Sequence, residues 1–342
     1  MPYFQGLFEK RCLTIGAPTQ LSFFTTAFSI LFTILNVPGN FLVILAVAKD
    51  PYKNLRTPFN YLMANLALAD LIVGTVTDPM SIYNHWKEGI NAKLLKREVQ
   101  IFHMSYFISC TASVLSLATL AVERYLAISN PHTYRNRFTT KRVFATAGCI
   151  WLVSFTIPFI YFEVGTVTYA FIFANTAIVL AIAITCFTFG LMIRAFQHRA
   201  RSDAPIAITN HNVEHENSTT HAVGRNAQSQ TAAKWERKVT KMFLVVLLAL
   251  LCCYGPSTVF IYAMSFCESC SCTALHWFRD LQFLFVIMNS SVNFFCYALR
   301  SRRFKNAFAH ILKIKRMGEA EPVSNSGTRF THCSTDRIDT RI

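Results

Sequence analysis

The stretch "LSFFTTAFSILFTILNVPGNFLVILAVA", residues 21–48, contains no charged side chain. A helix needs about 20 consecutive, mostly apolar residues to cross the hydrocarbon core of a bilayer, and this stretch is longer than that. The whole chain has the same bias, because 53% of its residues are hydrophobic and only 15% are charged. A soluble domain carries about a quarter charged residues. Residues 21–48 therefore predict the first helix of a membrane protein.

Six further apolar stretches follow. The seven predicted spans cover residues 21–48, 58–84, 100–128, 142–163, 167–196, 239–265 and 275–299. The loop between the fourth and fifth spans must be very short, so a count of six spans, with residues 142–196 divided wrongly, is the alternative. The predicted fold class is all-α: a seven-transmembrane helix bundle over residues 21–300.

The distribution of Lys and Arg predicts the orientation of the chain. The side that holds residues 1–20 carries seven of the 33 Lys and Arg residues, and the opposite side carries the rest. Cytoplasmic loops are the ones rich in Lys and Arg. We therefore expect a multi-pass plasma-membrane protein with residues 1–20 extracellular and its C-terminus cytoplasmic. The net charge of +15 then faces anionic lipid of the inner leaflet. Nucleic-acid binding is not expected, because the basic residues flank the spans instead of forming one patch.

Three cytoplasmic segments lie outside the spans. Residues 197–236 are predicted to form the third cytoplasmic loop. In residues 301–316, Phe304, Phe308, Ile311 and Leu312 fall on one helix face and the basic residues fall elsewhere. This pattern predicts an amphipathic eighth helix on the inner leaflet, with an ordinary basic flank as the alternative. Residues 317–342 are rich in Ser and Thr and are predicted to be disordered.

Polar side chains inside the spans are costly, so each is a candidate functional residue. Asp70 and Ser113 are predicted to meet polar side chains of the last span near the middle of the membrane, by about 1.5 Å of rise per residue. One carboxylate among hydroxyl and amide groups suits Na⁺. The alternative is a protonated Asp70 whose hydrogen bonds only pack the helices. The residues of this candidate sodium site are Asp70, Ser113, Asn289, Ser290 and Asn293.

One face of the third span is predicted to line the bundle. Its positions follow the alternating three- and four-residue step of a helix face and are residues 103, 106, 110, 113, 117, 120 and 124. Its outer half is where a small ligand could enter. The alternative is an aromatic lining that binds no ligand. The candidate ligand-binding residues are His103, Tyr106, Phe107 and Cys110, with Tyr254, Thr258 and Ile261 on the sixth span.

The polar residues and their order resemble the rhodopsin-like (class A) G-protein-coupled receptors. The resemblance covers residues 21–315. One short motif alone is weak evidence, but several in the family's order are specific. The motifs are "GN" at Gly39-Asn40, "NLALAD" at Asn65–Asp70, "ERY" at Glu123–Tyr125, Trp151, "CYGP" at Cys253–Pro256 and "NFFCY" at Asn293–Tyr297.

The resemblance implies a receptor that binds an extracellular ligand and promotes nucleotide exchange on a heterotrimeric G protein. It implies that Glu123 and Glu236 hold Arg124 at rest and that Tyr125 and Tyr297 belong to the same switch. Arrestin would bind the Ser- and Thr-containing tail. An enzyme is not expected, because the chain lacks HExxH, GxSxG and paired-carboxylate motifs. An ion-coupled transporter is the alternative, although transporters usually contain two related halves. No cofactor is expected beyond allosteric Na⁺.

The chain also departs from the family pattern. Val99 stands where the third span usually has a Cys, the fifth span lacks its Pro, Phe294 replaces a Pro and Tyr254 replaces a Trp. These departures loosely resemble the melanocortin, cannabinoid and lysophospholipid branch. The seventh span has no Lys, so a retinal Schiff base is excluded there. Tyr106 stands where amine receptors carry an Asp, so a biogenic amine is not expected. A small molecule, a lipid or a peptide remains as the ligand class.

Four cysteines lie outside the spans on the extracellular side: Cys12, Cys267, Cys270 and Cys272. An even number of cysteines in an oxidising compartment predicts two disulfides. A Cys270–Cys272 bond would be strained, so Cys12 pairs with Cys270 or Cys272 and Cys267 takes the other. Either pattern ties the N-terminus to the third outer loop, and free thiols are the alternative. The pattern resembles the outer-loop cysteines of melanocortin receptors.

Overall fold

The computed structural model describes residues 15–129, 138–203, 248–298 and 301–313, together with Phe8, Arg11, Cys12, Tyr134 and Val245. Apart from short turns, the described residues are helical and contain no strand. In chain order, the elements are α2 (Thr19–Lys49), α3 (Pro58–Ile72), η1 (Val73–Thr77), α4 (Asp78–Gly89), α5 (Lys96–Ser129), α7 (Thr140–Thr156), η2 (Ile157–Ile160), α8 (Tyr161–Val164), α9 (Thr166–Phe173), η3 (Ala174–Ile178), α10 (Val179–Asp203), the helix Leu248–Phe266, α12 (Cys272–Ala298) and α13 (Arg302–Ile311).

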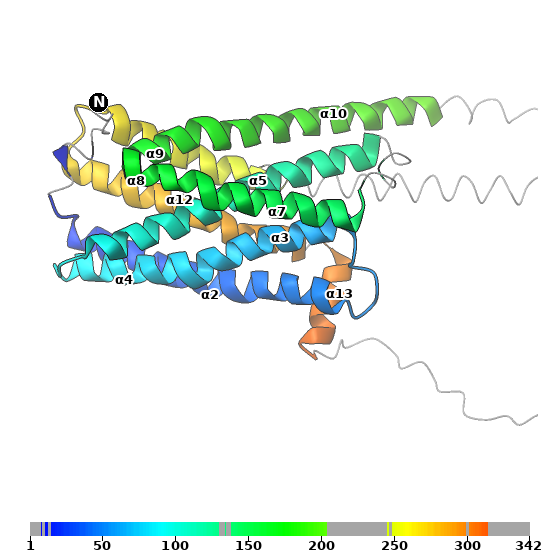
Figure 1. The fold of residues 1–342 in the computed structure, drawn as a ribbon, viewed down its shortest axis with the longest axis horizontal. Helices are drawn as coiled ribbons and strands as arrows, with labels where there is room; N and C mark the ends of the chain where they lie inside the picture. Colours follow the sequence, from blue (N-terminus) through cyan, green and yellow to red (C-terminus); the bar gives the residue numbers. More distant parts are fainter. Residues whose placement is uncertain are drawn as a thin grey trace, which may run out of the picture.

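Seven long helical rods lie side by side and form one bundle (Figure 1). Within the described part of the chain, six of them are long and apolar enough to cross a membrane: Thr19–Lys49, Pro58–Gly89, Lys96–Ser129, Thr140–Val164, Thr166–Ala195 and Leu248–Phe266. The seventh rod is α12, which has 27 residues and packs against α2 and α3. The predicted all-α bundle is therefore confirmed.

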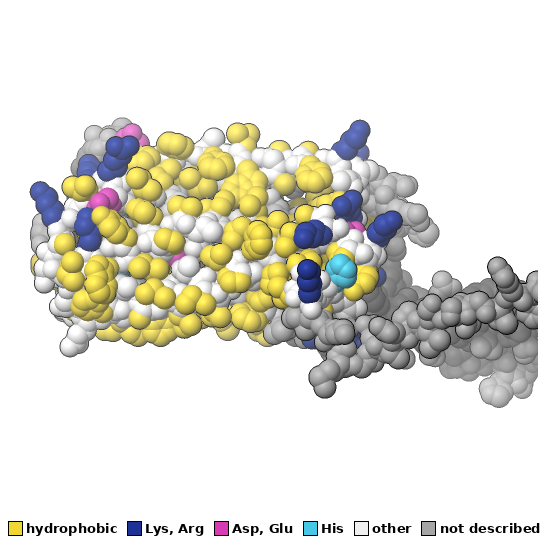
Figure 2. Space-filling view, turned by 90° about the horizontal axis from the view of Figure 1, so that it is seen from below, with side chains coloured by type: hydrophobic (Ala, Val, Ile, Leu, Met, Phe, Trp, Pro, Cys, Tyr) yellow, Lys and Arg dark blue, Asp and Glu magenta, His cyan; other side chains and the backbone are white. Residues whose placement is uncertain are grey.

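The flank of the bundle is covered with apolar side chains, while Lys and Arg gather at its two ends (Figure 2). Large apolar side chains that would be buried in a soluble domain are exposed here, for example Leu152 at 66% and Phe187 at 67%. Exposure on this scale is stable only in contact with lipid, because contiguous apolar patches on soluble monomers are small. The chain is therefore a multi-pass membrane protein.

A single glycine joins the fourth and fifth spans. Gly165 lies between α8 and α9 and has a φ of 86°, a backbone conformation that side-chain-bearing residues rarely adopt. Its N–H donates to the Tyr161 carbonyl at 3.0 Å and its carbonyl accepts from the Tyr169 N–H at 3.0 Å. The chain reverses within this turn, so the alternative of six spans is wrong.

Short polar motifs fix the first turn between spans. Asp50 follows α2 in the left-handed conformation and its side chain accepts hydrogen bonds from the N–H groups of Asn54 and Leu55, both at 2.9 Å. Thr57 then caps α3 by accepting from the Asn60 N–H at 3.3 Å, and Pro58 occupies the first helical position, where no N–H is needed. These local hydrogen bonds turn the chain back so that α3 packs against α2.

One predicted boundary is wrong. The second span continues beyond residue 84 to Gly89. The fifth span, Thr166–Ala195, agrees with the predicted residues 167–196, and α10 continues past it to Asp203. Both extensions contain charged residues, which hydropathy places outside a span although the helical hydrogen bonds continue. The segment 204–244 lies outside the described residues.

α12 and α2 approach closely at Gly39. A Cβ atom added at this residue would lie 2.5 Å from Phe294 Cγ, closer than atoms can pack. The aromatic ring that replaces the usual proline therefore rests directly on the glycine. The ring also lies near the tilted ring of Phe308 in α13, with 6.1 Å between centroids. Phe304 and Ala307 of α13 are buried. A helix thus follows the seventh span as expected, while its location on a membrane surface stays a prediction.

Candidate functional site

Asp70 lies at the centre of a buried polar cluster. Its carboxylate is fully enclosed and accepts a hydrogen bond from Asn293 Nδ2 at 3.0 Å and from Ser113 Oγ at 3.3 Å. α3, α5 and α12 thus meet at this carboxylate, as the sequence predicted. Ser290 is buried near this level of α12, and the buried amide of Asn289 has no hydrogen-bond partner in the described part of the chain.

Further amide side chains extend this polar cluster to α2 and α7. Asn40 Nδ2 donates to the Ser290 carbonyl at 3.3 Å, and Asn36, which the sequence analysis did not single out, donates to the Asp70 carbonyl at 2.9 Å. On the other side, Asn65 links Ser116 of α5 to Trp151 of α7. It donates to the serine hydroxyl at 2.9 Å and accepts from the indole N–H at 2.9 Å.

The charged pair near the C-terminal end of α5 is buried. Arg124 Nε and Nη2 donate to the two carboxylate oxygens of Glu123 at 2.5 and 2.6 Å. Glu123 is fully enclosed and Arg124 is 8% exposed, so neither charge is solvated by bulk water. The Tyr134 hydroxyl also donates to Glu123. Its burial and the neighbouring carboxylate raise the pKa of Tyr134, which keeps the hydroxyl protonated as a donor.

The other predicted switch residues are only partly visible. Tyr125 is half-buried on α5. Tyr297 belongs to α12, but its side chain lies outside the described residues, as does all of Glu236. The predicted contact between Arg124 and Glu236 therefore stays a prediction.

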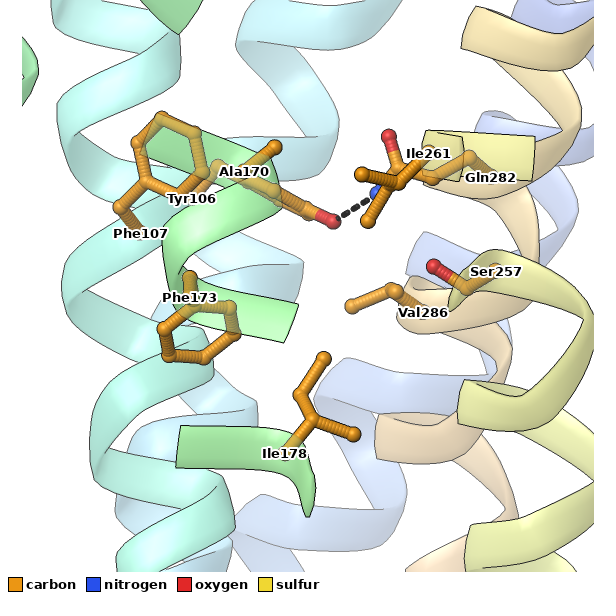
Figure 3. Close-up of a pocket in the computed structure, with 9 residues that line it drawn as sticks. All are labelled: Tyr106, Phe107, Ala170, Phe173, Ile178, Ser257, Ile261, Gln282 and Val286. Atoms are coloured by element: carbon orange, nitrogen blue, oxygen red, sulfur yellow. Dashed lines mark hydrogen bonds between the residues drawn. The ribbon is translucent and has the colours of Figure 1, made fainter. Parts of the chain in front are cut away.

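A cavity lies between the third, fifth, sixth and seventh spans (Figure 3). Its accessible space is about 10 Å³, roughly the room that one water needs, whereas sites for drug-sized ligands usually have about 300–1,000 Å³. Side chains would therefore have to move to admit a ligand of that size. The nine lining residues are Tyr106, Phe107, Ala170, Phe173, Ile178, Ser257, Ile261, Gln282 and Val286. None of them carries a charge.

Three polar side chains line this mostly apolar space. Gln282 Nε2 donates to the Tyr106 hydroxyl at 2.5 Å, which joins α5 to α12 across the cavity wall (Figure 3). The hydroxyl of Ser257 is buried and makes no hydrogen bond within the described residues. Neither Ser257 nor Gln282 was predicted. Both lie on the inner helix faces next to predicted residues, so the helical spacing that selected Tyr106 would have found them if applied to the sixth and seventh spans.

The predicted ligand-binding residues separate into two groups. Tyr106, Phe107 and Ile261 line the cavity, whereas His103, Cys110, Tyr254 and Thr258 do not. His103 lies on the outer side, with Nδ1 at 3.1 Å from the Tyr161 hydroxyl and 3.2 Å from the Thr166 hydroxyl. The remaining three are held within the packed helices: Cys110 and Tyr254 are buried, and the Thr258 hydroxyl donates to the Tyr254 carbonyl.

Two disulfides lie at one end of the bundle. Cys12 pairs with Cys272 and Cys267 pairs with Cys270, which is one of the two patterns that the sequence left open. Arg11 lies against the loop between the last two spans, where its Nη1 donates to the Glu268 carbonyl at 2.6 Å. Cys12 is fully buried in this contact.

The sequence analysis missed an ionic network that joins α2, α4 and α12. Arg279 donates to both oxygens of Glu88 at 3.2 and 3.0 Å and to Asp280 Oδ1 at 2.7 Å. Asp280 is buried and also accepts from the Thr25 hydroxyl at 2.9 Å, and its carboxylate lies 3.5 Å from His85 Nε2. These charges are close to the predicted span ends, where charged residues are ordinary, so composition alone does not single them out.

Comparison with known proteins decides the family. Residues 39–297 match the sequence profile described as 7 transmembrane receptor (rhodopsin family). The chain belongs to this family. The match covers most of the bundle, from Gly39 of α2 to the last turn of α12. The rhodopsin-family receptors are receptors and not enzymes, as the absence of catalytic motifs had suggested.

Individual relatives of this rhodopsin-family receptor are distant. Octopamine receptor beta-2R of Chilo suppressalis is 25% identical over 321 residues, which cover 84% of this chain and 79% of that protein. Neuromedin-U receptor 2 of Homo sapiens is 26% identical over 297 residues, covering 82% and 69%. Dopamine receptor 4 of Caenorhabditis elegans is 35% identical over 131 residues, covering 37% and 24%. Two of these three are amine receptors, which counts partly against the expectation of a non-amine ligand.

Proposed function

We propose that this receptor binds an uncharged, mostly apolar extracellular ligand in the cavity of Figure 3 and thereby promotes nucleotide exchange on a heterotrimeric G protein. The observation that carries the proposal is the composition of the cavity wall, which has nine residues and no charge. Its polar groups are the paired side chains of Tyr106 and Gln282 and the hydroxyl of Ser257. Such a site recognises shape, apolar surface and one or two hydrogen bonds.

The amine receptors among the relatives argue for a cationic ligand instead. A protonated amine needs an anion nearby, because burying an unpaired charge costs several kcal/mol or more. The phenol of Tyr106 already accepts the hydrogen bond from Gln282 and offers no such anion. The cavity therefore supports an uncharged ligand, and octopamine and dopamine are the compounds that test this part of the proposal.

Signalling would proceed through Arg124. In this structure the guanidinium is buried and paired with Glu123, so a G protein cannot reach it without a rearrangement. A buried ion pair adds little stability, but breaking it exposes a charge that a partner can bind, which suits a two-state switch. We assign the observed arrangement to the resting state, with Glu236 as a second partner of Arg124 and Tyr125 and Tyr297 as neighbours of the switch.

Asp70 would hold Na⁺ in the resting state. The proposal is supported by the Ser113 hydroxyl, 3.3 Å from the carboxylate, and by Asn293, whose amide now presents Nδ2 to the carboxylate and would turn its oxygen toward a cation. The unpaired amide of Asn289 offers one more oxygen. We further propose that the receptor is inserted in the plasma membrane with residues 1–20 outside, and that arrestin binds residues 317–342.

The experiment that tests the function is a nucleotide-exchange screen on membranes that contain the receptor. Each of several purified Gα subunits is combined with uncharged lipids, with octopamine or with dopamine. We expect an uncharged compound to stimulate exchange, Arg124→Ala to abolish the stimulation and Ala170→Leu, which fills the cavity, to raise the concentration required. Ala183→Leu on the exposed face of α10 is the matched control and should behave like the wild type.

Stimulation by an amine and by none of the uncharged compounds would refute the ligand class. Equal responses of the Ala170 and Ala183 variants would refute the location of the site. An agonist that still works in Arg124→Ala would refute the role of the switch.

A further inference from the structure

The guanidinium of Arg124 rests on an aromatic ring that the family motif does not include. Arg124 Cζ lies 3.8 Å from the centroid of the Phe59 ring. Carboxylate oxygens of Glu123 occupy the edge of the same guanidinium, at 2.5 Å from Nε and 2.6 Å from Nη2. Arg124 is thus held at its edge by a charge and at its face by a ring. Phe59 belongs to the second span, so this contact joins α3 to α5.

The surroundings make the ring contact stronger than a surface one. A cation over an aromatic face is attracted by the ring quadrupole, and the attraction grows when water is excluded. The side chain of Arg124 is only 10% exposed and that of Glu123 is fully buried. Phe59 itself packs against the apolar cluster formed by Ala121, Ile128 and Met192. The ring is therefore fixed by its neighbours and cannot turn freely away from the cation.

The local sequence also fixes where Phe59 begins its helix. Thr57 is the N-cap of α3 and Pro58 follows it, so Phe59 lies in the first turn. Asn60 anchors the same turn, because its side chain donates to the Leu55 carbonyl at 2.8 Å. The ring thus comes from a rigid helix start and not from a loop side chain.

We propose that Phe59 is a positioning residue of the switch, which holds Arg124 in the resting arrangement and must release it before a G protein binds. The inference rests on the proposed coupling function. It adds a restraint on Arg124 that lies in the described part of the chain and is independent of Glu236. Loss of the ring removes an attraction from the resting state alone, because the ring contact is made in the arrangement where Arg124 is buried.

The test compares Phe59→Leu, Phe59→Tyr and the wild type in the full-length receptor. Phe59→Leu keeps an apolar side chain but removes the ring, and we expect basal nucleotide exchange to rise about five- to thirtyfold, the factor equivalent to ~1–2 kcal/mol. Phe59→Tyr keeps the ring and should restore low basal exchange. Phe189→Leu is the matched control, because Phe189 packs on the same cluster without covering the guanidinium, and its basal exchange should stay at the wild-type level.

A second readout does not involve a G protein. The ring should shift the NMR signals of the Arg124 side chain upfield, and the shift should vanish in Phe59→Leu and persist in Phe59→Tyr. Arg124→Lys assigns the signal. Equal melting temperatures of the two leucine variants would show that altered exchange does not come from general loss of packing.

The outcomes separate the two proposals. A ring-current shift without any change of basal exchange in Phe59→Leu, while wild-type exchange responds to agonist, would overturn the positioning role. The same rise of exchange in Phe59→Leu and Phe189→Leu would also overturn it, because the effect would then be one of packing. If the wild type drives exchange on no Gα subunit, the coupling function fails, and the NMR shift still decides whether Phe59 holds Arg124.

Discussion

Asp280→Asn is expected to destabilise the receptor through the ionic network that joins α2, α4 and α12. The buried carboxylate accepts from Arg279 Nε at 2.7 Å and from the Thr25 hydroxyl at 2.9 Å. Asparagine has the same shape, but its amide nitrogen donates and cannot accept. The amide oxygen can still accept from Arg279, and the amide nitrogen can donate to the Thr25 hydroxyl, which also accepts, but both partners lose a full negative charge.

The size of the effect follows from these contacts. A hydrogen bond to a charged group contributes about 1.5–3 kcal/mol and a neutral one about 0.5–1.5 kcal/mol, so the two contacts together lose about 1.5–3 kcal/mol. For a chain of this size, each kcal/mol lowers the melting temperature by about 2 °C, so the variant should melt roughly 3–6 °C below the wild type. Thr25→Val removes the same contact from the other side. The double variant should therefore be more stable than the sum of the two single changes predicts.

The assay is thermal unfolding in detergent, followed with a dye that reacts with newly exposed thiols. Cys110 and Cys253 are free and buried, so they report the opening of the bundle. Lys87→Gln at the same end of the bundle is the control and should shift the melting temperature less, because Lys87 and Glu98 are both about one-fifth exposed. An unchanged melting temperature for Asp280→Asn, or strict additivity with Thr25→Val, would show that the contact contributes nothing to stability.

Three further changes test other contacts. Gly39→Ala should lower the melting temperature or fail to assemble, because its Cβ would lie 2.5 Å from Phe294 Cγ; wild-type stability would contradict this close approach. Asp70→Asn should remove the dependence of agonist affinity on sodium concentration, and radioligand binding in sodium and in a large organic cation measures it. Equal sodium dependence in both proteins would favour plain helix packing. Cys12→Ser should leave Cys272 open to alkylation in peptide mapping and reduce surface expression, and an already reactive Cys272 in the wild type would speak against the disulfide.

Much of the bundle could be predicted because the bilayer imposes one simple rule on composition. A span has to be apolar over about 20 residues, and residues 21–48 or 100–128 satisfy this without tertiary information. Helix ends are different, because the hydrogen bonds of a helix continue into the polar region. α4 therefore extends to Gly89 through Lys87 and Glu88, where hydropathy had ended the span at residue 84.

The polar cluster around Asp70 could be predicted because a charged residue is unusual inside a membrane span. Asp70 in the middle of a span is such a residue, and its neighbours Ser113 and Asn293 were found by depth alone. Ser257 could not be found in this way, since a serine inside a helix usually donates to its own backbone. Contacts between side chains on different helices could not be predicted from the sequence either. Nothing in the sequence brings Phe59 to Arg124, because the contact depends on how α3 packs on α5.

The one-residue turn at Gly165 has a consequence for how the protein is made. Only Gly165 separates the fourth and fifth helices, so the two spans enter the translocation machinery as one mostly apolar stretch with no polar loop between them. Neither helix can be released into the lipid with its end anchored in water on that side. We therefore expect the two to leave as a preformed hairpin, with the glycine turn at its tip. The α5 helix, against which they pack, must already be in the bilayer when the hairpin inserts.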